Sequence, residues 1–139
     1  MIFRAMFQPV VALVAWTFVM WAWMYATRLP AVRKAKMRLD SNAPRGEQMA
    51  QLPASVRWKA DNYNHLFEQP TLFYAVAIVL ALVSQDAVDV SLAWAYVGLR
   101  VIHSVFQAAI NKIEVRFVLF MLSALVLLAM TVRAAAALF

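Results

Sequence analysis

Residues 10–26 read VVALVAWTFVMWAWMYA and lie within an uncharged run that extends from Met6 to Thr27. As an α-helix, this run of 22 residues would be about 33 Å long, enough to cross a hydrocarbon core of about 30 Å. The apolar core of a signal peptide has only about 7–15 residues and precedes small residues at a cleavage site. Because the run is longer and rich in aromatic residues, we predict a membrane span over residues 6–27.

Three further apolar segments follow, over residues 66–85, 90–110 and 115–135. An acidic turn with Asp86 and Asp89 separates the first two, and residues 111–114 separate the last two. A connection as short as the second permits only an antiparallel helical hairpin. The pattern predicts an all-α fold, an integral membrane four-helix bundle, in a single domain over residues 1–139. Pro70 is expected to bend the second span, because proline removes a backbone donor.

The composition excludes most other classes of protein. Hydrophobic residues make up 65% of the 139 residues and charged residues only 14%, against roughly 45–50% and about 25% in soluble domains. A small globule leaves too much of its surface in water to hide so many apolar side chains. A soluble monomer is therefore excluded, and so is a disordered chain. The sequence contains no cysteine, which excludes disulfides, zinc–thiolate sites, iron–sulfur clusters and cysteine nucleophiles.

Most of the net charge lies in one segment. The chain carries a net charge of +6, and residues 28–65 hold eight of its thirteen basic residues but only three acidic ones. A basic loop between apolar spans marks the cytoplasmic side of a membrane, and a bacterial inner membrane is the simplest expectation. Pro30, Pro44, Gly46 and Pro53 predict turns in this loop, before a polar helical lead-in to the second span. We expect membrane lipids as partners and no nucleic acid, since few base-stacking aromatics accompany the charges.

Polar side chains inside the spans are the candidate functional residues, because hydrocarbon excludes them unless they face a partner or a wet cavity. The first two candidates are four residues apart, and the next three lie at i, i+3 and i+7, so each group is expected to share one helical face. All lie in the cytoplasmic half of the expected topology, where they can converge on one cavity for an anionic ligand. The candidates are Asn64, Glu68, Arg100, His103, Gln107 and Arg116.

Structural interpretations of the same residues stay open. Arg100 and Glu68 can form a buried ion pair that fixes helix register. His103 can be a hydrogen-bonded packing residue, and Arg116 a cation that reaches the headgroups. No metal site is expected, because His65 and His103 form no metal-binding motif such as HExxH.

Two motifs resemble those of a known family, the membrane-associated proteins in eicosanoid and glutathione metabolism (MAPEG). Residues 64–73, NHLFEQPTLF, resemble the family's Asn…Glu…Pro-x-Phe signature at the start of the second span. Residues 100–103, RVIH, resemble its Arg-x-x-His motif, and Arg116 follows sixteen residues after the first arginine, as a later arginine does in the family. The chain is thus identified as a bacterial-type member of this family.

The resemblance implies a homotrimer that binds glutathione between neighbouring subunits near the cytoplasmic face. It implies that Asn64, Glu68, Arg100 and His103 contact glutathione and that Arg116 is catalytic, stabilising the thiolate. The implied activity is that of a glutathione-dependent transferase or peroxidase acting on hydrophobic electrophiles from the bilayer.

Departures from the family pattern leave alternatives open. Gln107, a cofactor-binding candidate, stands where the family usually has a tyrosine, and Phe120 replaces an aromatic hydroxyl. These changes favour a non-enzymatic membrane subunit or lipid-binding protein of the same fold. A small multidrug transporter is a further alternative, but such exporters depend on a carboxylate in the first span. Here the first span contains none, and Glu68 lies at the entrance of the second.

Overall fold

The computed structural model describes residues 2–84 and 86–139. The elements in chain order are α1 (Ile2–Lys34), α2 (Glu47–Ala50), α3 (Ala54–His65), α4 (Gln69–Val83), α5 (Ala87–Val105), the π-helix η1 (Phe106–Ile110) and α6 (Ile113–Leu138). No strand occurs within the described residues, which confirms the predicted all-α class. Residue 85, the predicted end of the second span, lies outside the described residues.

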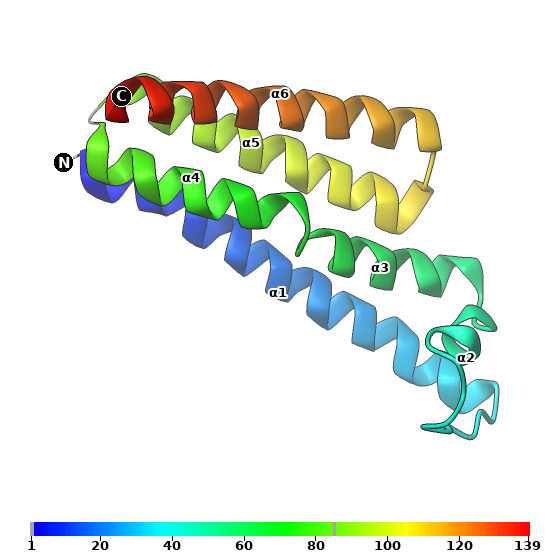
Figure 1. The fold of residues 1–139 in the computed structure, drawn as a ribbon. Helices are drawn as coiled ribbons and strands as arrows, with labels where there is room; N and C mark the ends of the chain where they lie inside the picture. The colour runs from blue at the N-terminus through cyan, green and yellow to red at the C-terminus, as the bar shows by residue number, and fades with distance from the viewer. Residues whose placement is uncertain (1, 85) are drawn as a thin grey trace.

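The long helices run side by side (Figure 1). Helix α1 packs against α3, α4 and α5, while α6 packs against α4 and α5. Small side chains, among them Ala77, Ala93 and Ala134, are buried between the helices, which lets the backbones approach closely. The stacked rings of Phe73 and Tyr96, with centroids 4.5 Å apart, join α4 to α5 at the centre of the core. The chain termini and the α4–α5 turn lie at one end, and α2 lies at the other (Figure 1).

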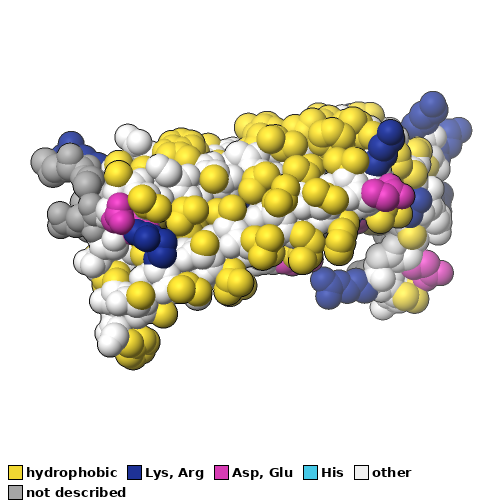
Figure 2. All heavy atoms as spheres, turned by 90° about the horizontal axis from the view of Figure 1, so that it is seen from above, with side chains coloured by type: hydrophobic (Ala, Val, Ile, Leu, Met, Phe, Trp, Pro, Cys, Tyr) yellow, Lys and Arg dark blue, Asp and Glu magenta, His cyan; other side chains and the backbone are white. Residues whose placement is uncertain are grey.

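The outer surface of the bundle is apolar over its middle. Figure 2 shows hydrophobic side chains covering the central part of one face, with charged side chains at its two ends. Three helical stretches are long and apolar enough to cross a membrane: Arg4–Lys34, Ala54–Val83 and Ile113–Leu138. Helix α5, which contains the predicted third span, is not among them. Its Asp89, Arg100 and His103 are buried rather than facing outward, and these polar residues lower its mean hydropathy.

Helix α1 extends further than predicted. It continues through Pro30, where we expected a turn, and ends at Lys34. A proline removes one N–H donor and bends a long helix without necessarily ending it. The helix stops where the chain reaches Lys36, whose φ of 48° lies in the left-handed region. The first part of the expected basic loop, residues 28–34, is therefore helical.

The predicted second span is broken near its start. Helix α3 ends at His65 and α4 begins at Gln69, so residues 66–68 separate two helices. Pro70 lies in the first turn of α4, where its missing N–H is not needed by the helix. The irregularity expected at Pro70 is thus a break just before it. The Thr71 hydroxyl donates a hydrogen bond of 2.6 Å to the carbonyl of Glu68 at this break.

A π-helical turn ends α5 at the same end of the bundle as α3. Asn111 adopts a left-handed conformation with a φ of 55° and leads through Lys112 into α6, which begins at Ile113. The Nζ of Lys59 on α3 donates to the carbonyl of Ala108 at 3.2 Å and lies over the ring of Trp23 on α1. This one side chain therefore links α1, α3 and η1, and it helps to fix the register of α5.

Candidate functional site

Arg100 is the largest fully buried side chain of the chain's described part, with none of its surface exposed. Its Nε and both terminal nitrogens donate no hydrogen bond to any described residue. A buried polar group without a partner costs about 1–3 kcal/mol, and more when it is charged. A cation kept in this way is a candidate for binding an anion.

His103 lies three residues further along α5 and Gln107 lies in η1, and both are buried. Neither the His103 Nδ1 nor the Gln107 Oε1 has a hydrogen-bond partner within the residues that the structure describes. Ser104, between them, donates to the Oδ1 of Asn62 at 2.9 Å, a buried hydrogen bond that ties α5 to α3. The face of α5 that carries Arg100 is thus held inside the bundle by the Ser104 hydroxyl. The guanidinium of Arg100 and the Nδ1 of His103 on this face have no hydrogen-bond partner among the described residues.

Arg116 lies on the first turns of α6 and is half-buried. Its Nη1 donates to the Oδ1 of Asn111 at 2.6 Å, whereas its Nε is enclosed and donates to no described acceptor. Arg116 lines an open recess of about 370 Å³ together with His65, His103, Ile113, Phe117 and Phe120. We call this the histidine–arginine recess. It joins one cation and two imidazoles to an apolar wall.

Three members of this recess, His65, His103 and Phe120, form a ring cluster that the sequence did not indicate. The His65 ring lies 5.2 Å from that of His103 and 5.6 Å from that of Phe120, measured between centroids. From the sequence we expect no metal site at His65 and His103, and His65 is not among the candidate site residues. The sequence carries one signal for a role of His65: it lies three residues before Glu68, and side chains at that spacing can meet on a helix surface.

Glu68 pairs with His65 rather than with Arg100. The His65 Nδ1 lies 2.9 Å from a Glu68 carboxylate oxygen, and the Glu68 side chain is 67% exposed. Among the described residues no ion pair joins Glu68 to Arg100. The interpretation of these two residues as a buried ion pair is therefore wrong, and the guanidinium of Arg100 is left without a counterion in hydrogen-bond contact.

Asn64 does not join the other candidates. It lines a second recess, of about 400 Å³, whose charged members are Arg28, Arg45, Arg57 and Asp61. We call this the basic recess. Asn64 and Glu68 do not share one helical face as expected, because the helix is interrupted between them. Asn64 lies on α3, and Glu68 precedes α4. Within one chain the six predicted residues therefore do not converge on a single cavity.

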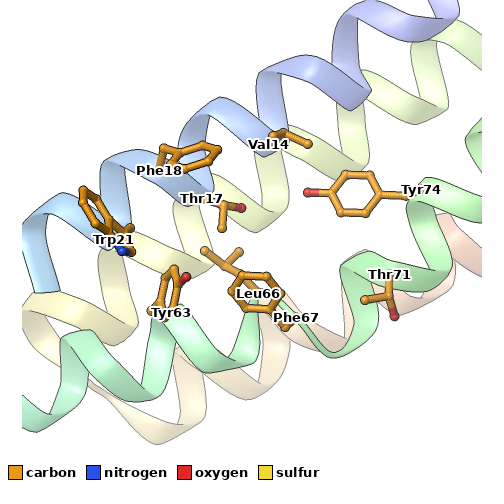
Figure 3. A pocket seen from close by; sticks show the side chains of 9 residues that line it. All are labelled: Val14, Thr17, Phe18, Trp21, Tyr63, Leu66, Phe67, Thr71 and Tyr74. Carbon is orange, nitrogen blue, oxygen red and sulfur yellow. The ribbon is translucent and has the colours of Figure 1, made fainter.

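A third recess lies between α1 and the α3–α4 junction (Figure 3). It measures about 170 Å³ and is lined mainly by aromatic and aliphatic side chains. Phe18 and Trp21 project from α1, facing Tyr63 and Phe67, and the Tyr74 hydroxyl points toward Thr17 (Figure 3). We call this the aromatic recess. The sequence analysis did not identify it, since its residues come from segments distant in the chain.

No curated protein and no solved structure matches this chain. The profile of the MAPEG family, in contrast, matches residues 6–136, nearly the whole chain. The all-helical fold with its three apolar, membrane-length helices agrees with that match. The chain is a membrane protein of the MAPEG family.

Proposed function

We propose that this protein is a glutathione-dependent transferase or peroxidase that acts on hydrophobic electrophiles at the histidine–arginine recess. The observation that carries the proposal is the buried guanidinium of Arg100, unpaired among the described residues, three residues before His103, which lines the recess together with Arg116. Two cations with free donor atoms suit an anionic ligand.

The polar atoms at this end of the bundle fit glutathione, a tripeptide with two carboxylates and one amine. The free nitrogens of Arg100 and Arg116 are donors for carboxylates, and the Gln107 Oε1 is an acceptor for an amide or amine. The exposed carboxylate of Glu68 is a second acceptor for the amine. A recess of about 370 Å³ lies within the range of about 300–1,000 Å³ typical of small-ligand sites.

Glutathione, when bound, supplies a thiol nucleophile. Arg116 on the recess wall favours the charged form of a nearby thiol, because an adjacent guanidinium stabilises negative charge. His103 and Arg100 behind it orient the ligand's charged groups. The apolar wall, which includes the exposed side chains of Ile113 and Phe117, receives a hydrophobic electrophile from the lipid.

We further propose the assembly and topology that this function requires. Helices α1, α4, α5 and α6 all cross the membrane as a four-helix bundle, and residues 28–65 face the cytoplasm of a bacterial cell. Three copies form a homotrimer in which a neighbouring subunit closes the open side of each recess. The openness of the recess and the separate location of Asn64 support this arrangement, because a second chain can bring further polar groups to the site.

The thiolate itself provides the test. Reduced glutathione added to the detergent-purified protein should give the ultraviolet absorbance of a thiolate, and chlorodinitrobenzene should be conjugated. Arg116→Ala should lose both signals. Arg4→Ala serves as a matched control, because Arg4 is exposed and lies near the chain's beginning, on the first turns of α1. Unchanged thiolate absorbance in Arg116→Ala would contradict the role of Arg116.

A non-enzymatic lipid-binding protein of the same fold is the second candidate. The aromatic recess favours it, because an apolar hollow of about 170 Å³ on the membrane-facing bundle accommodates part of an acyl chain or a ring. This candidate predicts no conjugation and a defined lipid that purifies with the protein. Trp21→Ala should then release that lipid, whereas Trp94→Ala, on helix α5 and outside the aromatic recess, should retain it.

A further inference from the structure

The interruption between α3 and α4 brings His65 and Glu68 together. His65 is the last residue of α3, and α4 begins at Gln69. The Glu68 N–H donates to the His65 carbonyl at 3.2 Å, which closes a turn over residues 65–68. Leu66, within this turn, is buried in the hydrophobic core. The turn, visible between α3 and α4 in Figure 1, therefore has a fixed backbone from which both side chains project.

The hydrogen bond between these two side chains determines which ring nitrogen of His65 carries the proton. The His65 Nδ1 lies 2.9 Å from a carboxylate oxygen of Glu68. An ionised carboxylate only accepts hydrogen bonds, so the Nδ1 is the donor, and in a neutral imidazole the Nε2 is then a bare acceptor. Among the described residues no hydrogen bond reaches this Nε2, and it is not one of the enclosed polar atoms. His65 thus has a free and accessible proton acceptor.

Ring contacts from two other helices hold the imidazole of His65 in place. Its centroid lies 5.2 Å from that of His103 on α5 and 5.6 Å from that of Phe120 on α6, at interplanar angles of 36° and 35°. The same side chain lines the histidine–arginine recess beside Arg116. A catalytic group has to be held close to its productive geometry by packing and by hydrogen bonds. The imidazole of His65 has both kinds of support.

His103, the other histidine of the recess, lacks this arrangement. Its Nδ1 is enclosed and has no hydrogen-bond partner among the described residues. No carboxylate in the described part of the chain pairs with it. A histidine that acts as a general base is oriented by a third group, which holds the ring nitrogen that does not take the proton. Of the two histidines, His65 is the one with such a partner, Glu68.

We propose that His65 is the general base of the conjugation reaction and that Glu68 positions it. This inference rests on the proposed function, in which Arg116 stabilises the thiolate. The Nε2 of His65 takes the proton of the glutathione thiol, so that the S–H bond breaks and its electron pair stays on sulfur. The Glu68 carboxylate balances the charge of the imidazolium until the proton passes to solvent. With chlorodinitrobenzene, the C–S bond then forms and chloride leaves with the electron pair of the C–Cl bond.

The pH dependence of conjugation by the detergent-purified protein is the first test. His65→Gln keeps a side chain that can donate to Glu68 but cannot take a proton. At about pH 6.5 this change should lower kcat/KM by about 100-fold, a size of effect typical of a lost general base. At about pH 9 the loss should be less than about tenfold, because much of a free thiol is already ionised there. Glu68→Gln, which keeps an acceptor without the charge, should lose about tenfold at the lower pH.

A matched control separates this effect from a general loss of charge. Glu47→Gln removes a carboxylate at an exposed position of α2, outside the histidine–arginine recess. Its pH profile should match that of the wild type. An equal loss in Glu47→Gln would overturn the role of the His65–Glu68 pair.

Counting protons provides a second test that does not depend on turnover. Glutathione is titrated calorimetrically, without an electrophile, in phosphate and in Tris buffer, whose ionisation enthalpies differ, and thiolate absorbance is recorded in parallel. In the wild type the thiol proton stays on His65, so few protons should reach the buffer for each thiolate formed. His65→Gln should release about one more proton for each thiolate. The same titrations show whether the variant is folded and still binds glutathione.

The outcomes distinguish failure of this inference from failure of the proposed function. If the wild type binds no glutathione, both are overturned. If the wild type conjugates and Arg116→Ala does not, but His65→Gln keeps the wild-type pH profile and proton count, the role of His65 alone is overturned. Loss of glutathione binding in His65→Gln would also overturn it, because His65 would then be a binding residue and not the base.

Discussion

Two arginines of the bundle, the partly exposed Arg133 and the buried Arg100, differ in their hydrogen bonding. At the end that holds both chain termini, Arg133 of α6 is satisfied: its Nη2 lies 2.5 Å from Asp86, and its Nε pairs with the buried Asp89. The Ser84 hydroxyl also donates to Asp89. At the other end, Arg100 is fully buried and lacks hydrogen bonds to any described residue. The contrast separates an arginine whose hydrogen bonds join helices from one that has no hydrogen bond to any described residue.

Arg133 lies near the end of the last apolar segment, and its ion pairs with Asp86 and Asp89 connect α6 to the start of α5. Asp86 caps α5 by accepting from the Val88 N–H at 2.9 Å. The cluster formed by Ser84, Asp86, Asp89 and Arg133 therefore has a complete structural explanation and needs no ligand.

The largest expected effect is on catalysis at the unsatisfied end. Arg116→Ala should lower kcat/KM for glutathione conjugation by about 100-fold or more, the size of effect seen when one charge-stabilising donor is removed from an active site. Conjugation of chlorodinitrobenzene by the reconstituted protein measures it. Arg4→Ala should keep the wild-type rate. A fall of equal size in Arg4→Ala would show that charge on the protein, not the recess, sets the rate.

Stability should respond most at the satisfied end. Asp89→Asn weakens the pairing with Arg133 and the hydrogen bond from Ser84, and hydrogen bonds to charged groups contribute about 1.5–3 kcal/mol. We therefore expect the free energy of unfolding to fall by about 2 kcal/mol, measured by denaturation in detergent. Asp61→Asn, at an exposed position of α3, is the control. A stable Asp89→Asn variant would remove the structural role from this cluster.

The sharpest contrast comes from Arg100→Met. Replacing a buried, unpaired cation with an apolar side chain of similar length should leave the free energy of unfolding unchanged or raise it by about 1 kcal/mol. The same change should weaken glutathione binding by about tenfold or more. Thermal unfolding with and without glutathione separates the effects, because a ligand stabilises only a protein that binds it. If the ligand-free variant is less stable than the wild type, Arg100 has a structural role, as Arg133 does.

The smallest effect concerns pH at the satisfied end. The Val88 N–H, and then Arg133, hold the pKa of Asp86 below its ordinary value of 3.8. The folded state thus binds this proton less tightly than the unfolded state does. The stabilisation is present above pH 3.8 and is lost as the pH falls through the lower, folded-state pKa. Asp86→Asn should show a shallower loss of unfolding temperature on acidification than the wild type. Parallel curves would contradict this.

The sequence predicted the helical class and the apolar runs because long uncharged stretches have few other stable structures in a membrane. Its errors arose where two local rules competed. Pro30 was read as a turn, but the surrounding helix was long enough to continue through it. The break at residues 66–68 and the π-turn over residues 106–110 have no simple periodic signal, because periodicity describes regular helices and not their interruptions.

Those interruptions explain which parts of the candidate site could be predicted. Arg100, His103 and Gln107 lie along α5 and η1, and all three are buried, as their shared spacing suggested. The prediction that Asn64 and Glu68 share a face rests on the i, i+4 spacing, which places side chains together only within one helix. The helix is interrupted between these two residues. The two further recesses join residues of α1 to residues of α3, a juxtaposition that follows from tertiary packing and not from local sequence.

The central claim is that the unsatisfied arginine end binds glutathione while the satisfied end does not contribute. Calorimetric titration of reduced glutathione into the detergent-purified wild type, Arg116→Ala and Arg4→Ala tests it most directly. We expect saturable binding by the wild type and by Arg4→Ala, and loss of binding in Arg116→Ala. Absence of binding by the wild type at several millimolar glutathione, or equal binding by Arg116→Ala, would contradict it.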